Sequence, residues 1–187
     1  MLTFIYRFIK CLIILILIST PLMIIGAISL LIYLGIKKNN APINLPKYLR
    51  WFDNADLYVG RDVSTYLKVI FSGWWSRYTW LAFRNPTNYF NYVYLGFVFK
   101  ESFVYIKHNS EEDKIGDTSK EGFRHIELVN GDGKRYYEYY YIKKYWFNPK
   151  VCFRFRMGWK IKDNKNKEKD AVQYCLVIAP YKEYTGV

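Results

Sequence analysis

The sequence is poor in cysteine and histidine, the residues that build most disulfide frameworks, zinc sites and nucleophilic catalytic sites. It has three cysteines and two histidines in 187 residues. Cys11, Cys152 and Cys175 show no CxxC spacing, which argues against a disulfide framework and against a zinc site. Cys152 and Cys175 fall on neighbouring predicted strands with an offset register, so we expect free thiols in a reducing compartment.

Acidic residues are also scarce, with 16 Asp and Glu against 28 Lys and Arg and a formal net charge of +12. Hydrophobic residues make up 51% of the chain and aromatic residues 20%, a composition that excludes intrinsic disorder and supports a sizeable core. A basic domain favours polyanions, either anionic lipid headgroups or nucleic acid, although part of the excess charge can serve solubility.

Charge is missing altogether from residues 11–36. At about 1.5 Å per residue, a helix of this length covers the ~30 Å hydrocarbon core of a bilayer. We therefore predict one transmembrane helix, kinked at Pro21 and closely packed at Gly26. The alternatives are a cleaved signal peptide, which the length of the run disfavours, and a re-entrant hairpin turning at Thr20 and Pro21. The residues expected to anchor the chain in the membrane are Leu12, Ile14, Leu17, Pro21, Ile25, Leu30 and Tyr33.

Cations flank this run on both sides, and more of them follow it than precede it. Arg7 and Lys10 come before the run, and four cations follow it closely, namely Lys37, Lys38, Lys47 and Arg50. This bias predicts a single-pass protein with a cytoplasmic C-terminal domain, and the aromatic residues Phe4, Tyr6 and Phe8 are expected in the membrane interface. The residues expected at the membrane surface are Lys37, Lys38, Arg50, Trp51, Trp74, Trp75, Arg77 and Trp80.

The sequence divides into an anchor over residues 1–38, a linker and acidic loop over residues 39–61, and a helix followed by a β domain over residues 62–187. Asp62 can cap an amphipathic helix over residues 63–82, which Asn85 and Pro86 end. Its apolar stripe is expected to pack on the β-sheet, to lie in the headgroup layer, or to do both.

Alternating apolar and polar residues predict five strands after Tyr92, over residues 93–108, 123–129, 135–145, 151–161 and 171–179. The first is one long strand or a bulged one, because the alternation slips near Glu101 and Ser102. The segment Asn130-Gly131-Asp132-Gly133 is typical of a tight hairpin, and Asn148-Pro149 marks a further turn. The fold class is therefore predicted as α+β: one N-terminal transmembrane helix, then an amphipathic helix and a five-stranded antiparallel β-meander.

Two groups of residues are candidates for metal binding and for proton transfer. Asp53, Asn54, Asp56 and Asp62 crowd one loop, but they lack the glycine and terminal glutamate of an EF-hand, so helix capping and ion pairing are favoured over a metal. His125 and Glu127 share one face of a strand and could transfer a proton, although a structural pair is the commoner arrangement. The sequence shows no known catalytic motif, and we expect no metal and no cofactor.

A tyrosine-rich strand beside arginines is a candidate for binding nucleic acid or a protein. Tyr137 and Tyr139 could stack bases while Arg154 and Arg156 bind phosphates. The alternative is that one tyrosine face is core and the other meets headgroups or a protein partner.

Three short motifs resemble a family of uncharacterised proteins from tailed bacteriophages. They are Pro46-x-x-Leu49-x-Trp51-Phe52-Asp53-x-x-Asp56, Trp80-Leu81-x-x-Arg84-Asn85-Pro86 and Arg156-x-Gly158-Trp159-Lys160. Members of that family are similar in plan, with a hydrophobic N-terminus and the same motifs over most of residues 45–181. The sequence departs from the family over residues 57–60. The resemblance implies a phage origin and no particular activity.

These features together predict a non-enzymatic, membrane-anchored phage accessory protein. It would bind anionic headgroups of the host inner membrane and a phage or host protein there, in envelope takeover, superinfection exclusion, or a virion or ejection role. A membrane-tethered single-strand nucleic-acid-binding protein is the second hypothesis, and an envelope-acting enzyme is the third.

Overall fold

The computed structural model describes residues 2–40, 44–53, 73–84, 86–98, 102–107, 120–161 and 171–186. The chain forms two compact units by packing: unit 1 is Met1–Leu12 with Val98–Val187, and unit 2 is Ile13–Phe97. The division predicted from the sequence, with boundaries at residues 38 and 61, separates a membrane anchor from a linker and a domain. It describes membrane attachment rather than packing, and it stays a prediction. Most of the predicted acidic loop and residues 63–72 of the predicted helix lie outside the described residues.

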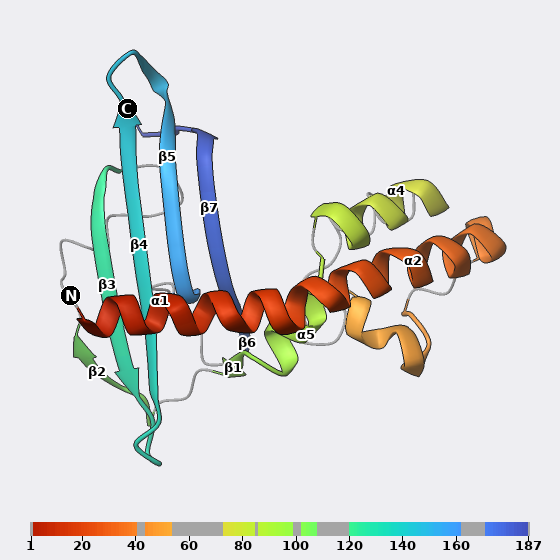
Figure 1. Ribbon diagram of the computed structural model, residues 1–187, viewed down its shortest axis with the longest axis horizontal. Coiled ribbons are helices and arrows are strands. Elements are labelled where there is room, and N and C mark those ends of the chain that lie inside the picture. The colour runs from red at the N-terminus through yellow and green to blue at the C-terminus, as the bar shows by residue number, and fades with distance from the viewer. Residues whose placement is uncertain are drawn as a thin grey trace. The chain divides into compact units, whose positions relative to one another are not determined.

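The N-terminus forms one long apolar helix over Leu2–Lys37, as predicted (Figure 1). It consists of α1 (Leu2–Ile14), the π-helical turn η1 (Leu15–Ser19) and α2 (Thr20–Lys37), and a short 3-10 turn, η2 (Lys38–Asn40), follows. Pro21 lies in the first turn after η1, where the backbone N–H of Thr20 bonds the carbonyl of Leu15. Pro21 has no N–H to donate, and the wider π-helical turn before it shifts the neighbouring backbone hydrogen bonds by one residue. The helix therefore continues through Pro21.

Unit 1 contains a five-stranded antiparallel sheet whose neighbours follow the order of the chain, which confirms the predicted meander and the α+β class (Figure 1). Its strands are β2 (Val104–Lys107), β3 (Gly122–Val129), β4 (Arg135–Tyr145), β5 (Asn148–Trp159) and β7 (Tyr174–Glu183). Two further strands are very short, β1 (Phe97–Val98) and β6 (Ala171–Val172).

The turn between β3 and β4 is the predicted hairpin. Gly133 adopts a positive φ of 76°, and the side chain of Asn130 accepts a hydrogen bond from the backbone N–H of Lys134 at 2.7 Å. Asparagine and glycine suit such a turn because one bonds the local backbone and the other tolerates positive φ at no steric cost.

Three predicted boundaries are wrong. Residues 93–108 do not form one strand, because α5 (Asn88–Val93) and β1 precede β2. The turn before β5 lies at Trp146 and Phe147, and Asn148 already belongs to the strand. The last strand does not stop before Pro180, because β7 is an edge strand and an edge tolerates a residue without an N–H.

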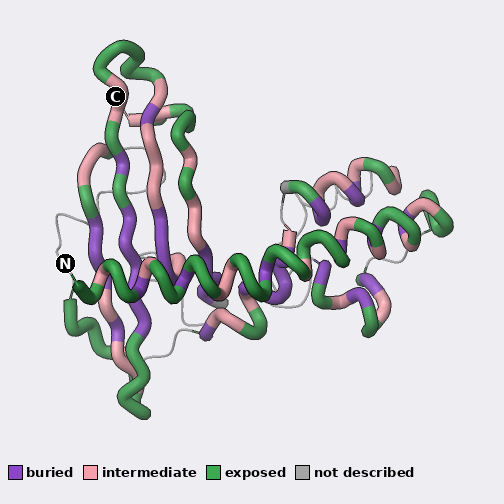
Figure 2. Tube along the Cα trace, in the orientation of Figure 1, coloured by how far each residue is buried: buried purple, intermediate pink, exposed green. Residues whose placement is uncertain are grey.

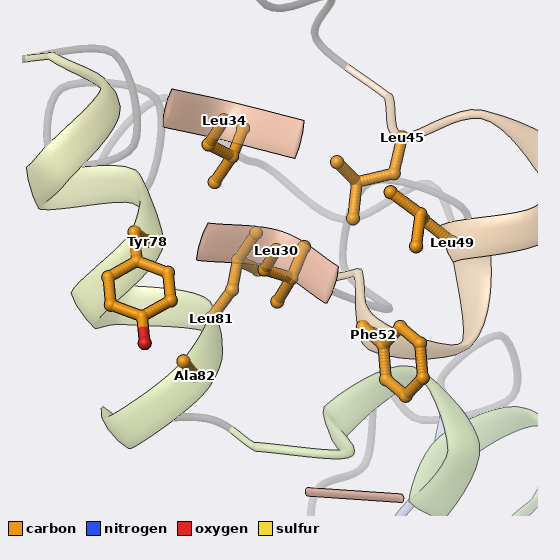
Figure 3. Packing of buried hydrophobic residues seen from close by; sticks show 8 residues of the cluster. All are labelled: Leu30, Leu34, Leu45, Leu49, Phe52, Tyr78, Leu81 and Ala82. Atoms are coloured by element: carbon orange, nitrogen blue, oxygen red, sulfur yellow. The ribbon is translucent and has the colours of Figure 1, made fainter. Parts of the chain in front are cut away.

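Unit 2 packs short helical elements against α2. These are η3 (Lys47–Phe52), α4 (Trp74–Thr79) and the π-helical turn η5 (Trp80–Arg84), whereas α5 packs against η3. Figure 3 shows the core that they share, which comprises Leu30, Leu34, Leu45, Leu49, Phe52, Tyr78, Leu81 and Ala82. The described part of the predicted stripe, Tyr78, Leu81 and Ala82, packs on α2 within unit 2. The expectation that the stripe covers the β-sheet stays a prediction. The helix ends at Arg84, directly before Asn85 and Pro86, as predicted.

Candidate functional site

The helix α1 covers one face of the sheet in unit 1, and the residues of this contact form the candidate site (Figure 1). Phe4, Arg7, Phe8 and Cys11 recur at the spacing that places side chains on one face of a helix. Cys11 is fully buried, with its Sγ 3.9 Å from the backbone oxygen of Cys175. We call the side of the sheet that α1 contacts the α1 face.

Arg7 is the polar centre of this contact. Its Nη1 donates hydrogen bonds to Oε1 of Glu127 and, at 2.9 Å, to the hydroxyl of Tyr139. Its guanidinium also lies over the ring of Tyr137, 4.4 Å from the centroid. Arginine suits this position because its planar group can bond a carboxylate and stack on an aromatic ring at once. Arg7 is buried, whereas its position beside the apolar run predicts a flanking cation.

His125 and Glu127 lie side by side beneath α1, as their spacing predicts, with Nε2 of His125 2.9 Å from Oε1 of Glu127. Burial lowers the pKa of His125, and the charges of Lys107 and Arg7 lower it further against the opposing effect of Glu127. Burial opposes the charge of Glu127, but the hydrogen bonds and charges of Arg7 and His125 outweigh it, so the pKa of Glu127 lies below its usual value. The pair is therefore a neutral imidazole beside a carboxylate already bonded to Arg7, an arrangement suited to holding α1 on the sheet.

Aromatic rings complete the contact. Phe4 meets the ring of Tyr139 edge to face at 5.0 Å, and both Phe4 and Phe8 lie about 6 Å from Phe155. Tyr137 and Tyr139 are consequently buried. They are not exposed platforms on which bases could stack in this structure.

The other face of the sheet holds a buried charge cluster. Glu138 is fully buried and bonds Arg156 at 2.5 Å and Arg124 at 3.3 Å. Both guanidinium groups also approach the ring of Tyr140, at 4.9 and 5.1 Å. Paired, hydrogen-bonded charges are the form in which ionised groups are tolerated in a core. This cluster was not predicted from the sequence, although strand alternation sets Glu138 on the face opposite Tyr137 and Tyr139.

The four residues predicted to bind nucleic acid therefore do not form one surface. Tyr137 and Tyr139 lie on the α1 face, and Arg156 is buried on the opposite face with Glu138. Arg154 is two residues away on the same strand and is half-buried.

The residues predicted at the membrane surface lie in or next to unit 2, and most of them are accessible. Lys37 and Lys38 are exposed, as are Trp51 and Trp75, and Arg50, Trp74 and Trp80 are half-buried. Arg77 is the exception, because only 1% of it is exposed, so it is not a surface cation.

The predicted anchoring residues are mostly exposed, and Figure 2 shows that most of the helix Leu2–Lys37 is exposed or half-buried. Leu12, Leu17, Pro21 and Ile25 are exposed and Ile14 and Tyr33 are half-buried. Leu30 is buried in the core of unit 2 and contacts protein rather than lipid. Gly26 is a point of close packing, as predicted, because a Cβ there would lie 2.5 Å from the ring of Phe52.

The acidic loop is represented among the described residues by Asp53 alone. Its carboxylate accepts a hydrogen bond from the backbone N–H of Leu45 at 2.7 Å, and its carbonyl accepts one from Tyr89. Asn54, Asp56 and Asp62 lie outside the described residues. In the part of the chain that the structure describes, no cluster of His, Cys, Asp and Glu could hold a metal ion, and all three cysteines are free.

The motif residues that the structure describes act in packing. Gly158 has a φ of 96°, and a Cβ on it would lie 2.2 Å from the backbone oxygen of Tyr137. Trp159 packs its ring against Tyr137 and Tyr174, and Lys160 donates to the side chain of Gln173.

Comparison with known proteins identifies a family for this chain but no activity. Residues 1–186 match the model described as "Family of unknown function (DUF7338)". No curated protein and no solved structure matches the chain.

Proposed function

The chain belongs to DUF7338, a family of unknown function, and we propose that it is a membrane-anchored phage accessory protein that binds at the inner-membrane surface of its host. The observation that carries the proposal is the helix Leu2–Lys37, which is long and apolar enough to cross a membrane. Only 17% of its most apolar 18-residue window is buried within the protein. Such a helix needs a further apolar environment, and a bilayer supplies one.

The free energy gained by burying the exposed apolar side chains of this helix supports attachment to lipid. The large apolar side chains that the helix exposes include Ile9, Ile13, Ile16, Leu17, Ile24, Ile25, Ile28, Leu31 and Ile32. Burying a large aliphatic side chain contributes about 1.5–3 kcal/mol, so half-exposed side chains gain roughly 1 kcal/mol each. Nine of them gain on the order of 10 kcal/mol, more than enough for stable attachment.

The location and the biological role are further parts of the proposal. The cations after the apolar run support a cytoplasmic C-terminal domain, and the motif resemblance supports a phage origin. Envelope takeover, superinfection exclusion, and a virion or ejection role each require a protein at this membrane with a phage or host partner.

The other two hypotheses draw no support from the geometry. Nucleic-acid binding would need Tyr137 and Tyr139, which α1 covers. A proton-transfer enzyme would need Glu127, whose carboxylate is bonded to Arg7.

Membrane flotation of the full chain from lysed host cells tests the proposal. We expect the chain to float with lipid after a carbonate wash. Ile24→Glu with Ile28→Glu should reduce the floating fraction, whereas the matched change Asn40→Glu with Asn44→Glu, at exposed polar positions, should leave it unchanged. A wild-type chain that stays soluble at the bottom of the gradient would refute the proposal.

A further inference from the structure

A single crossing of a bilayer separates the residues before a helix from those after it. Here Phe4, Arg7 and Cys11, at the start of the helix, contact strands that come more than 100 residues later. A return crossing would need a second apolar run, but the next longest uncharged stretch, residues 85–99, has 15 residues, too few to span ~30 Å as a helix. Both ends of the helix are therefore on one side of the membrane when α1 is docked on the sheet.

We propose that the N-terminal helix lies in the plane of one leaflet and that unit 1 contacts the bilayer through its α1 face. This inference rests on the proposed membrane attachment and replaces the single crossing predicted from the sequence. The ligand is a bilayer surface that contains anionic phospholipid headgroups. An in-plane helix buries its apolar side about 5–10 Å into the boundary between headgroups and acyl chains.

The outer side of α1 is the first part of this surface. Leu2, Ile5, Ile9 and Leu12 are exposed, whereas Arg7 and Cys11 point at the sheet and are buried. The stripe of exposed side chains therefore faces away from the sheet. The charge of Arg7 is neutralised beneath the helix by Glu127, so the outer stripe can enter lipid without carrying that charge with it.

The uncovered part of the sheet is the second part. The strands run on past α1 (Figure 1), and the residues of the α1 face remain apolar there. Phe123, Tyr141 and Ile178 are exposed and Phe153 is half-buried, and they adjoin Phe155, which is half-buried at the contact with Phe4 and Phe8. Pairing places all five on the same face: Phe123 and Phe155 both oppose Tyr141, Ile178 opposes Phe155, and Phe153 lies two residues along β5. A sheet face in contact with water alone is normally polar, so exposed apolar and aromatic side chains together on one face mark an interaction surface.

Cations at the α1 face make an anionic lipid surface a better match than a neutral protein surface. Lys10 is exposed on α1, and Lys107 is exposed on β2 opposite Glu127. Lys143 is exposed on β4 beyond Tyr141, but it already pairs with Glu121 at 3.4 Å, so Lys10 and Lys107 supply the attraction. Near a membrane each such cation contributes about 1 kcal/mol of attraction to anionic lipid.

The turn between β4 and β5 gives this end of the sheet an aromatic tip. Trp146 is 94% exposed, and its ring meets that of Phe147 edge to face. Tyr145 stacks between Phe147 and Tyr181 at 5.0 and 5.4 Å. Tryptophan and tyrosine are the side chains that prefer the headgroup layer.

Environment-sensitive labels on one strand test the surface. Ile178→Cys places a thiol on the α1 face of β7, and Lys182→Cys places one on the opposite face of the same strand. Each full-length variant is labelled with an NBD fluorophore and added to vesicles of phosphatidylglycerol and phosphatidylcholine, with labelled wild type as the blank for the three buried native thiols. We expect the label at residue 178 to brighten, shift to the blue and be quenched by doxyl lipids, and the label at residue 182 to remain in water.

The outcomes separate this inference from the proposed function. A chain that floats with vesicles while its label at residue 178 stays in water overturns the bilayer contact and leaves membrane attachment standing. A chain that does not float overturns both. In host cells, epitope tags at both ends should share one protease accessibility, and tags on opposite sides of the membrane would overturn the in-plane helix.

Discussion

The docking of α1 on the sheet depends on Arg7, and Arg7→Met is the change that tests it. Methionine keeps an apolar stem of similar length and removes the guanidinium. The variant would leave Glu127 without its ion-pair partner beneath the helix and would remove the contact over the ring of Tyr137.

The expected loss is about 3 kcal/mol. Removing one partner of a buried ion pair costs about 3–5 kcal/mol. The lower end applies because 11% of the Arg7 side chain and 13% of the Glu127 side chain remain exposed. A difference of about 3 kcal/mol raises the population of chains with α1 undocked roughly 100-fold.

Cys11 reports this opening directly, because it lies on the docked side of α1 and is fully buried. Alkylation in detergent micelles, followed by mass spectrometry, measures its modification rate separately from those of Cys152 and Cys175. We expect Arg7→Met to accelerate modification of Cys11 and to leave the other two thiols at their wild-type rates.

Lys10→Met is the matched control, since Lys10 is an exposed cation on the same helix. It should not change the rate at Cys11. Adding Glu127→Gln to Arg7→Met should have less than an additive effect, because the two side chains act as one pair. If the reagent alkylates Cys11 in the Arg7→Met variant at the wild-type rate, the ion pair does not hold α1 on the sheet.

Further changes test the pH dependence, two close backbone contacts and a thiol. Because burial and nearby cations hold the pKa of His125 below its ordinary value of about 6.5, the unfolded chain takes up a proton that the folded chain does not. Stability should therefore fall as pH drops below about 6.5, and His125→Asn should flatten that part of the profile of unfolding free energy against pH. Gly158→Ala should cost about 2–4 kcal/mol of unfolding free energy, since positive φ and the contact with a neighbouring carbonyl oxygen both oppose a Cβ. Gly26→Ala should cost about 1–3 kcal/mol, because an aromatic ring must move, and a melting temperature unchanged from wild type would contradict this. The Cys175 thiol, whose pKa burial raises to about 11, should resist alkylation at pH 8 until the chain unfolds.

Much of the fold was predictable because it depends on local patterns. The uncharged run, the alternation in β4 and β5, and the Asn130–Gly133 turn each determine their element through nearby residues. The errors lie where a tertiary contact or an edge position overrides a local signal. Pro180 predicts a strand end, but at a sheet edge its missing N–H removes no ladder bond.

The candidate site was predictable only in part. The spacing of His125 and Glu127 placed them together, but the third member, Arg7, comes 118 residues before His125. A cation beside an apolar run is normally interpreted as a signal of membrane topology. Sequence spacing carries no information about a contact between the first turns of a helix and a distant strand. Similarly, the motif residues Gly158 and Trp159 stood out in the sequence, but only the structure shows that they pack against Tyr137.

Hydrophobicity and strand alternation are properties of neighbouring residues, so a long apolar helix and an antiparallel meander could be predicted from the sequence alone. The contact between the first turns of that helix and the sheet joins residues far apart in the chain, so it is seen only in the folded protein. That contact is the observation behind the proposed in-plane helix, and it leaves Phe123, Tyr141 and Ile178 exposed on the same face of the sheet.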